Sequence, residues 1–174
     1  MTVFVAGVHG VGKSYLCQQY ALEYGVLHES ASGLIRQELS QAQWSADKKV
    51  QNVDANQQAL RSAVNRINDQ GRSLLLDGHF VLIGSGSKLI CLDSSVFDGL
   101  SLTGVILIEA APELISSRLV ERDAQKSAVD VRTFMDAENA QAQSVCRSLG
   151  IALKILFSPT HEEFSSVVSD FFKK

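Results

Sequence analysis

The chain has 174 residues, of which 45% are hydrophobic and 20% are charged, and its formal net charge is −3. This length suits one domain with a sizeable core, and the composition is ordinary for a globular protein. The weak negative charge gives no basic footprint for nucleic acid, and no apolar run approaches the roughly 20 residues of a membrane span. We therefore expect neither a nucleic-acid partner nor a membrane anchor.

The three cysteines, Cys17, Cys91 and Cys146, are far apart and odd in number. Their spacing fits neither a metal site nor a disulfide framework, so we expect small, buried, apolar side chains in a reducing compartment. A strand is predicted from the first residues onward, so no signal peptide is expected before the fold. The expected location is the cytoplasm.

The first predicted element is a buried strand over Thr2–Ala6, a short apolar run. A helix is predicted from about Lys13 to Tyr24, with apolar positions at helical spacing. Between them lies Gly7-Val8-His9-Gly10-Val11-Gly12-Lys13-Ser14. This stretch fits the phosphate-binding loop pattern, which is Gly, four residues, Gly, Lys, then Ser or Thr, between a strand and a helix. The alternative is a tight strand-to-helix turn that is merely rich in glycine.

Three glycines in this stretch, Gly7, Gly10 and Gly12, allow backbone conformations that turn the amides inward into an anion-binding nest. The positive end of the following helix points at the same place and favours phosphate there. Lys13 would contact the β- and γ-phosphates of ATP, and the hydroxyl of Ser14 would bind Mg²⁺. We expect the nucleotide to be bound by this run and its neighbour: Gly7, Val8, His9, Gly10, Val11, Gly12, Lys13, Ser14 and Tyr15.

The next segments alternate between strand and helix patterns. A short strand over Val26–His28 precedes a helix that begins near Ser30–Ser32. A polar stretch, Ser40–Asn52, contains the only tryptophan, and a long helix follows over roughly Val53–Gln70. The apolar run Ser73–Asp77 then predicts a buried strand that ends in an acid.

The segment Phe80–Asp93 allows two interpretations. It could form a hairpin around Gly84–Ser87, in which Phe80–Ile83 pairs with Leu89–Leu92, because a four-residue connection with two glycines suits a hairpin. It could instead be a loop with strand-like ends.

Six further segments complete the chain: a strand over Gly104–Glu109, a helix over Ala111–Asp123, a polar crossing over Ala124–Val129, a helix over Asp130–Leu149, a strand over Ile151–Phe157 and a helix over His161–Phe172. Strands that alternate with helices predict an α/β fold of three layers, with about five parallel strands and helices on both faces. Without a linker or repeat, residues 1–174 are expected to form a single phosphate-loop domain. The ligand should lie beyond the carboxyl ends of the strands.

Two acids end buried strands in this scheme. Asp77 ends one strand, and in phosphate-loop proteins an acid at this place holds Mg²⁺, although it could also cap the next turn. Glu109 ends another strand and is a rival for the same role, or it simply starts the next turn. His79, two residues after Asp77, could be a turn or core histidine, or an acid or base.

Arginines supply the remaining candidates. Arg118 and Arg122 are four residues apart and share one helix face, from which they could offset the charge that develops on a transferring phosphoryl group. The alternative is a solvated helix face. Arg132 lies beyond the polar crossing and could join them. Arg36, at the start of the second helix, could meet the phosphate of an acceptor.

Taken in order, these pieces resemble the nucleoside monophosphate kinases, and most closely the compact archaeal-type adenylate kinases. The resemblance covers roughly Val3 to Phe157. It is carried by the loop Gly7–Ser14, by Ser32-Gly33-Leu34-Ile35-Arg36, by Asp77-Gly78-His79, by Val105–Ile115 with Arg118 and Arg122, and by Gly150–Leu156.

The resemblance implies an acceptor-binding arm at about 32–70, a short lid at about 118–132, and transfer of the γ-phosphoryl group of Mg-ATP to a nucleoside monophosphate. In the long form of the family, Pro-Arg follows Asp-Gly-aromatic, whereas this chain has His79-Phe80-Val81. The family usually has a second arginine on the helix after the lid, where this chain has Glu138-Asn139-Ala140. A kinase of another small metabolite and a nucleotide-switched ATPase that acts on a protein partner therefore stay open, as do a monomer and a small homo-oligomer.

Overall fold

Strands and helices alternate along the computed structural model, which describes residues 1–41, 53–123 and 130–173. The elements are β1 (Thr2–Ala6), α1 (Lys13–Tyr24), β2 (Leu27–Ser30), α2 (Ala31–Gln41), α3 (Val53–Asp69), β3 (Leu74–Asp77), β4 (Val81–Ile83), β5 (Leu89–Cys91), β6 (Leu102–Glu109), α4 (Pro112–Asp123), α5 (Val131–Leu149), β7 (Leu153–Phe157) and α6 (His161–Phe172). Short 3-10 turns lie at Ser85–Ser87 and Ser94–Val96. Trp44 and the polar crossing 124–129 lie outside the described residues.

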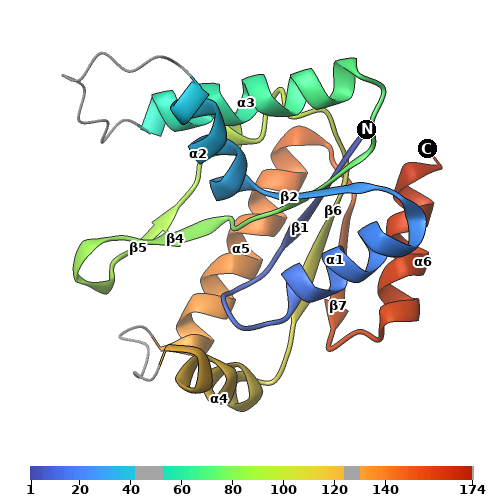
Figure 1. Ribbon diagram of the computed structural model, residues 1–174. Coiled ribbons are helices and arrows are strands. Elements are labelled where there is room, and N and C mark those ends of the chain that lie inside the picture. Colours follow the sequence, from blue (N-terminus) through green and yellow to red (C-terminus); the bar gives the residue numbers. More distant parts are fainter. Residues whose placement is uncertain (42–52, 124–129, 174) are drawn as a thin grey trace.

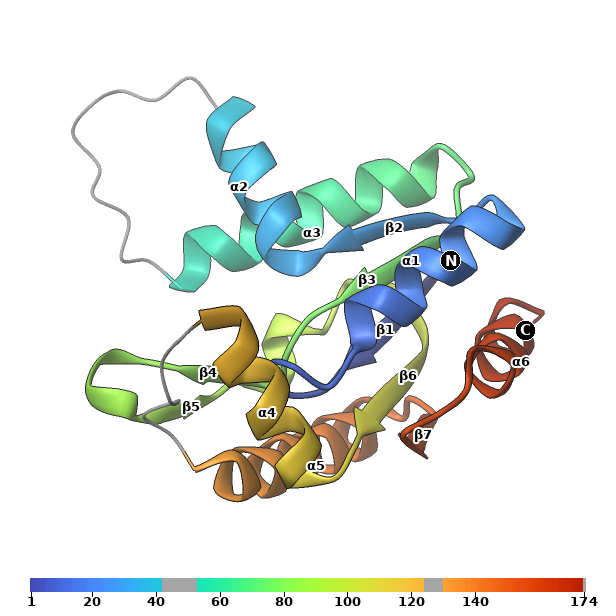
Figure 2. The same ribbon diagram turned by 60° about the horizontal axis from the view of Figure 1, so that its bottom comes forward.

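The main sheet has five strands in the order β2-β3-β1-β6-β7, and every neighbouring pair is parallel. Helices cover both faces of this sheet, with α1 and α6 on one side and α3 and α5 on the other (Figures 1 and 2). The predicted architecture of about five parallel strands between two helical layers is confirmed. Because β1 is the central strand, the loop that follows it opens at the middle of the carboxyl edge.

Successive side chains of each central strand point alternately toward the two helical layers, as the two-residue period of a strand requires. In β1, Val3 and Val5 pack with the α1 and α6 side, whereas Phe4 and Ala6 pack with the α3 and α5 side. The same alternation holds in β3 and β6, so the central strands are buried on both faces, as their continuous apolar runs predict.

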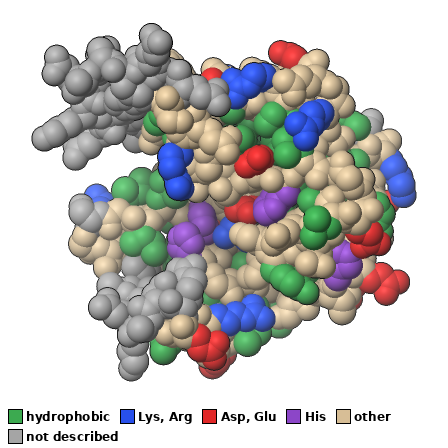
Figure 3. Space-filling view, viewed as in Figure 1, with side chains coloured by type: hydrophobic (Ala, Val, Ile, Leu, Met, Phe, Trp, Pro, Cys, Tyr) green, Lys and Arg blue, Asp and Glu red, His purple; other side chains and the backbone are tan. Residues whose placement is uncertain are grey.

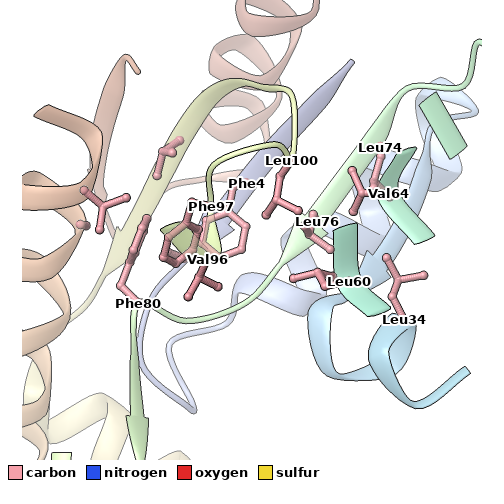
Figure 4. Close-up of a cluster of buried hydrophobic side chains, with 14 of the residues drawn as sticks. Phe4, Leu34, Leu60, Val64, Leu74, Leu76, Phe80, Val96, Phe97 and Leu100 are labelled. Atoms are coloured by element: carbon pink, nitrogen blue, oxygen red, sulfur yellow. The ribbon is translucent and has the colours of Figure 1, made fainter. Parts of the chain in front are cut away.

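A group of three phenylalanines holds the segment after β3 against the sheet (Figure 4). Phe4 of β1 meets Phe80 and Phe97 edge to face, with ring centroids 5.2 and 5.4 Å apart, and Phe80 and Phe97 are 4.6 Å apart. These aromatic contacts fix where the chain leaves β3, which is the turn that carries Asp77 and His79.

The hairpin interpretation of residues 80–93 is confirmed. β4 and β5 form a separate antiparallel pair, with Val81 opposite Cys91 and Ile83 opposite Leu89, and the hairpin projects from the side of the molecule (Figure 1). Cys91 is exposed on it, so the expectation of buried cysteines is wrong for this residue, whereas Cys17 and Cys146 are buried. Within the described ranges no helix combines the length and apolar character that a membrane crossing requires.

Candidate active site

The loop after β1 has the backbone that its glycines predict. Gly7, Gly10 and Gly12 have φ angles of 143°, 81° and 104°, all in the region that favours glycine. A Cβ atom at Gly7 would lie 2.5 Å from the carbonyl oxygen of Ile108, so this position also excludes a side chain by close approach. Gly12 is the N-cap of α1, and the loop therefore faces the positive end of that helix.

Lys13 and Ser14 are the first residues of α1. Lys13 is only 6% exposed, and its Nζ lies 3.4 Å from Nε2 of His79. Ser14 and Tyr15 are exposed at the mouth of the loop. A buried ammonium beside a nest of backbone amides forms a site for a polyanion.

Asp77 ends β3 beside the strand that feeds the loop, in register with Val5 of β1. Its Oδ2 lies 2.8 Å from Nε2 of His28, which β2 supplies. Burial raises the pKa of Asp77, but the His28 hydrogen bond, the charge of Lys13 and the Ser14 hydroxyl lower this pKa to a value below its usual range. The carboxyl group is therefore ionised at neutral pH and sits near both loop side chains.

An ionised carboxylate and a hydroxyl in this arrangement match the oxygen ligands that Mg²⁺ prefers. Within the described part of the chain no group of three or more His, Cys, Asp or Glu side chains could hold a metal ion alone. Ser14 and Asp77 are the residues here that could hold Mg²⁺, with phosphate oxygens as further ligands. The rival acid, Glu109, ends β6 and accepts a hydrogen bond from Nδ2 of Asn139 at 2.6 Å. It is thus engaged with α5.

His79 lies between the loop and α5. Its ring centroid is 4.2 Å from that of His9, and its buried Nδ1 atom has no hydrogen-bond partner among the described residues. Burial and the neighbouring charges of Lys13 and His9 lower the pKa of His79 to about 3. The imidazole is therefore neutral at physiological pH, so Nε2 can accept a hydrogen bond from the Lys13 ammonium.

Glu138 of α5 is a polar residue of this site that was not among the predicted site residues. It is 1% exposed, and its carboxylate accepts hydrogen bonds from the amides of Gly7, Phe80 and Val81. Burial raises the pKa of Glu138, while these three amides and the charge of Lys13 oppose the rise. A signal existed in the sequence, because Glu138 falls at helical spacing on the buried face that also carries Phe134.

Of the predicted arginines, one contacts the phosphate-binding loop and two others are exposed on other helices. Nη1 of Arg118 donates hydrogen bonds to the carbonyl oxygens of Gly10 and Val11, at 3.2 and 3.1 Å, so this residue does lie on the loop. The side chain of Arg122 lies outside the described residues. Arg132 and Arg36 are exposed, on α5 and α2 respectively. The structure therefore brings Arg118 to the loop.

Charged and histidine side chains meet in a hollow across the middle of the face shown in Figure 3. In this hollow acidic, basic and imidazole side chains lie side by side. His28 was also missed at the sequence level, and its only signal was a histidine in a short strand pattern.

Comparisons with known proteins address the fold. The profile of a protein family described as AAA domain matches residues 6–134. No curated protein matches the chain. Three similar solved structures are a proposed kinase from Chloroflexus aurantiacus j-10-fl, a sugar kinase from Janibacter sp. HTCC2649 and a gluconokinase from Sinorhizobium meliloti 1021.

Their TM-scores are 0.61, 0.58 and 0.53, and their sequence identities are 18%, 16% and 12%. The alignments cover 99% of this chain and 95%, 94% and 91% of the other chains. At these identities the likeness establishes a shared fold.

Proposed function

The chain belongs to the AAA domain family, with a P-loop NTPase fold, and we propose that it is an ATP-dependent phosphotransferase that acts on a small acceptor. The observation that carries this proposal is the loop Gly7–Ser14, whose glycine backbone faces the start of α1 and whose Lys13 lies beside Asp77. A nest of amides with a buried ammonium and an ionised carboxylate suits the donor phosphates of Mg-ATP.

On the donor side, Lys13 would bind the β- and γ-phosphates, and Ser14 and Asp77 would hold Mg²⁺. The ion would offset negative charge on the phosphates when bound. The His28 hydrogen bond at 2.8 Å orients the Asp77 carboxylate toward the loop. Catalysis in this chemistry comes mainly from positioning and charge stabilisation, which such a preformed site supplies.

Arg118 supports the same proposal from α4. Its guanidinium already lies on the carbonyl oxygens of Gly10 and Val11, next to the place where phosphates would lie. From there it could offset the charge that develops on the transferring group, together with Arg122 on the same helix.

A nucleoside monophosphate is the first candidate acceptor. The resemblance to adenylate kinases implies that Arg36 would hold the acceptor phosphate, and Arg36 is exposed, with no ion pair found inside the described ranges. A phosphate acceptor is already an anion, so this reaction requires no general base.

A small hydroxylated metabolite is the second candidate. Two other arginines of the arm are engaged within the protein, since Arg66 pairs with Glu38 and Arg61 donates to the carbonyl oxygens of Ser95 and Asp98. Only Arg36 on the described arm is then available to a second phosphate. Two structural neighbours are described as a sugar kinase and a gluconokinase, which is compatible with an acceptor of this kind.

Transfer of labelled γ-phosphate from Mg-ATP to a panel of acceptors tests the proposal. The panel contains nucleoside monophosphates, sugars and sugar acids, and Lys13→Ala is the control variant. Labelled product that depends on Lys13 is the expected result, and its identity selects between the two candidates. Release of phosphate that ignores every acceptor would indicate an ATPase, and a wild-type rate in Lys13→Ala would refute the site.

A further inference from the structure

The Glu138 carboxylate joins two segments that are far apart in the sequence. Oε1 accepts the Gly7 amide at 3.3 Å, and the two oxygens accept the amides of Phe80 at 3.0 Å and Val81 at 2.7 Å. We propose that Glu138 is a positioning residue of the donor site, which preforms the phosphate loop by fastening its first amide to the base of the β4–β5 hairpin. This inference rests on the proposed function.

The burial of Glu138 argues for an action through the loop. The residue is 1% exposed, so a bound nucleotide could not reach it directly. A buried carboxylate is costly unless hydrogen bonds satisfy it, and here three backbone amides do so. Charge-assisted bonds of this kind hold backbone more firmly than neutral ones.

Gly7 is held from both sides. Its amide donates a hydrogen bond to Glu138. On its other side, the carbonyl oxygen of Ile108 would lie only 2.5 Å from a Cβ atom at this position. Its φ of 143° is therefore set before any ligand arrives. A loop that is already shaped avoids the ordering cost that a flexible loop would incur on binding phosphate.

The same carboxylate holds the turn that carries Asp77. Phe80 and Val81 follow Asp77 within four residues, so their bonds to Glu138 keep the end of β3 in place relative to Gly7. His79 lies between them and the loop, with Nδ1 3.9 Å from Glu138 Oε1 and Nε2 3.4 Å from Lys13 Nζ. One buried side chain thus keeps both halves of the donor site together.

The substitution Glu138→Gln keeps the size of the side chain but sets an NH2 group against an amide donor. We expect the KM for Mg-ATP to rise about tenfold, the penalty for one orphaned buried amide, while kcat stays within about twofold. A loop that is no longer preorganised binds the ground state and the transition state more weakly by the same amount, so KM rises while kcat is nearly unchanged. Asp93→Asn is the matched control, because Asp93 accepts one backbone amide, from Ser95, on an exposed turn. Its KM and kcat should equal those of the wild type.

A merely structural role gives the opposite split. If Glu138→Gln only reduced the folded fraction, kcat per total protein would fall with KM unchanged, and that result overturns the proposal, as would unchanged values of both constants. Calorimetric titration with a non-hydrolysable Mg-ATP analogue distinguishes a failure of the proposed function from a failure of the inference about Glu138. No binding by the wild type refutes the proposed function itself, whereas equal binding by wild type and Glu138→Gln refutes this inference alone.

A measurement on the wild type covers the case in which the variant fails to fold. The Gly7 amide should exchange its hydrogen slowly in the nucleotide-free protein, because Glu138 already accepts it. Exchange at the rate of an open loop before nucleotide is added would overturn the proposal.

Discussion

Gly7 is the residue at which the loop tolerates least change. It has a φ of 143°, and a Cβ atom there would lie 2.5 Å from a backbone oxygen and 3.0 Å from a side-chain carbon of Val11. Since a backbone oxygen cannot move aside as a flexible side chain can, substitution must distort the loop or β6. The glycine pattern of the sequence thus has a steric cause at this position.

Gly7→Ala should therefore lower the free energy of unfolding by roughly 3 kcal/mol or more and abolish nucleotide binding. Urea denaturation and calorimetric titration measure the two effects. Gly25→Ala is the matched control, because Gly25 also has a positive φ, 67°, but nothing lies within 4 Å of its Cβ position. It should lose only about 1 kcal/mol, from backbone strain. Equal losses in the two variants would contradict the steric account.

His79 gives a prediction for pH. Burial, with the charges of Lys13 and His9, lowers its pKa from 6.5 to about 3. Below pH 6.5 the unfolded chain binds a proton on this imidazole, whereas the folded chain binds one only near pH 3. The free energy of unfolding should therefore fall as the pH decreases from 6.5 to about 3.

His79→Gln removes this contribution, so the variant should lose less stability than the wild type across that range of pH. Urea denaturation at several pH values checks the difference, with His161→Gln as control, because His161 is a half-buried histidine with a carboxylate partner, Glu23, far from the loop. Parallel curves for wild type and His79→Gln would show that the imidazole is not held neutral.

At the scale of elements, local signals predicted the boundaries well. The predicted helices Lys13–Tyr24 and His161–Phe172 match α1 and α6, and the hairpin lies where two glycines interrupt apolar runs. α1 and α5 end at Gly25 and Gly150, which adopt the left-handed conformation that glycine favours. These boundaries could be predicted from the sequence because each depends on a few adjacent residues.

The start of α6 tests such a local device. Thr160 Oγ1 accepts the Glu163 amide at 3.2 Å, and Glu163 Oε2 accepts the Thr160 amide at 2.8 Å, which together form a capping box. Thr160→Ala should lower the free energy of unfolding by about 1 kcal/mol, measured by urea denaturation. Thr160→Ser keeps the hydroxyl and should lose little. A similar loss in both variants would show that the methyl group, and not the hydrogen bond, matters.

At the scale of the whole molecule, the alternation of strands and helices predicted the fold class, but not the strand order β2-β3-β1-β6-β7. That order depends on contacts between segments far apart in the chain. The helical spacing of Glu138 with Phe134 indicated a buried position, but neither Glu138 nor His28 could be matched to its partner from the sequence. Their partners, Gly7 and Asp77, lie 131 and 49 residues away, and a local pattern does not identify a partner at such a distance.

The acceptor side was least predictable. The arm and the lid each include residues outside the described ranges, at 42–52 and 124–129. The phosphate-binding loop pattern was predictable from the sequence because its motif is contiguous, and the glycine φ angles fit it. An acceptor pocket is assembled from separate helices and carries no comparable contiguous pattern. The transfer assay with a panel of acceptors is therefore the experiment that identifies the acceptor.

Calorimetric titration of wild type and Lys13→Ala with a non-hydrolysable Mg-ATP analogue tests whether the Gly7–Ser14 loop binds the donor phosphates. We expect saturable binding by the wild type and at least about tenfold weaker binding by Lys13→Ala, because a charge-assisted contact to the phosphates is lost. The two proteins should have the same circular dichroism spectrum. Equal affinity in both proteins, or no binding by the wild type, would contradict a donor site built on Gly7–Ser14.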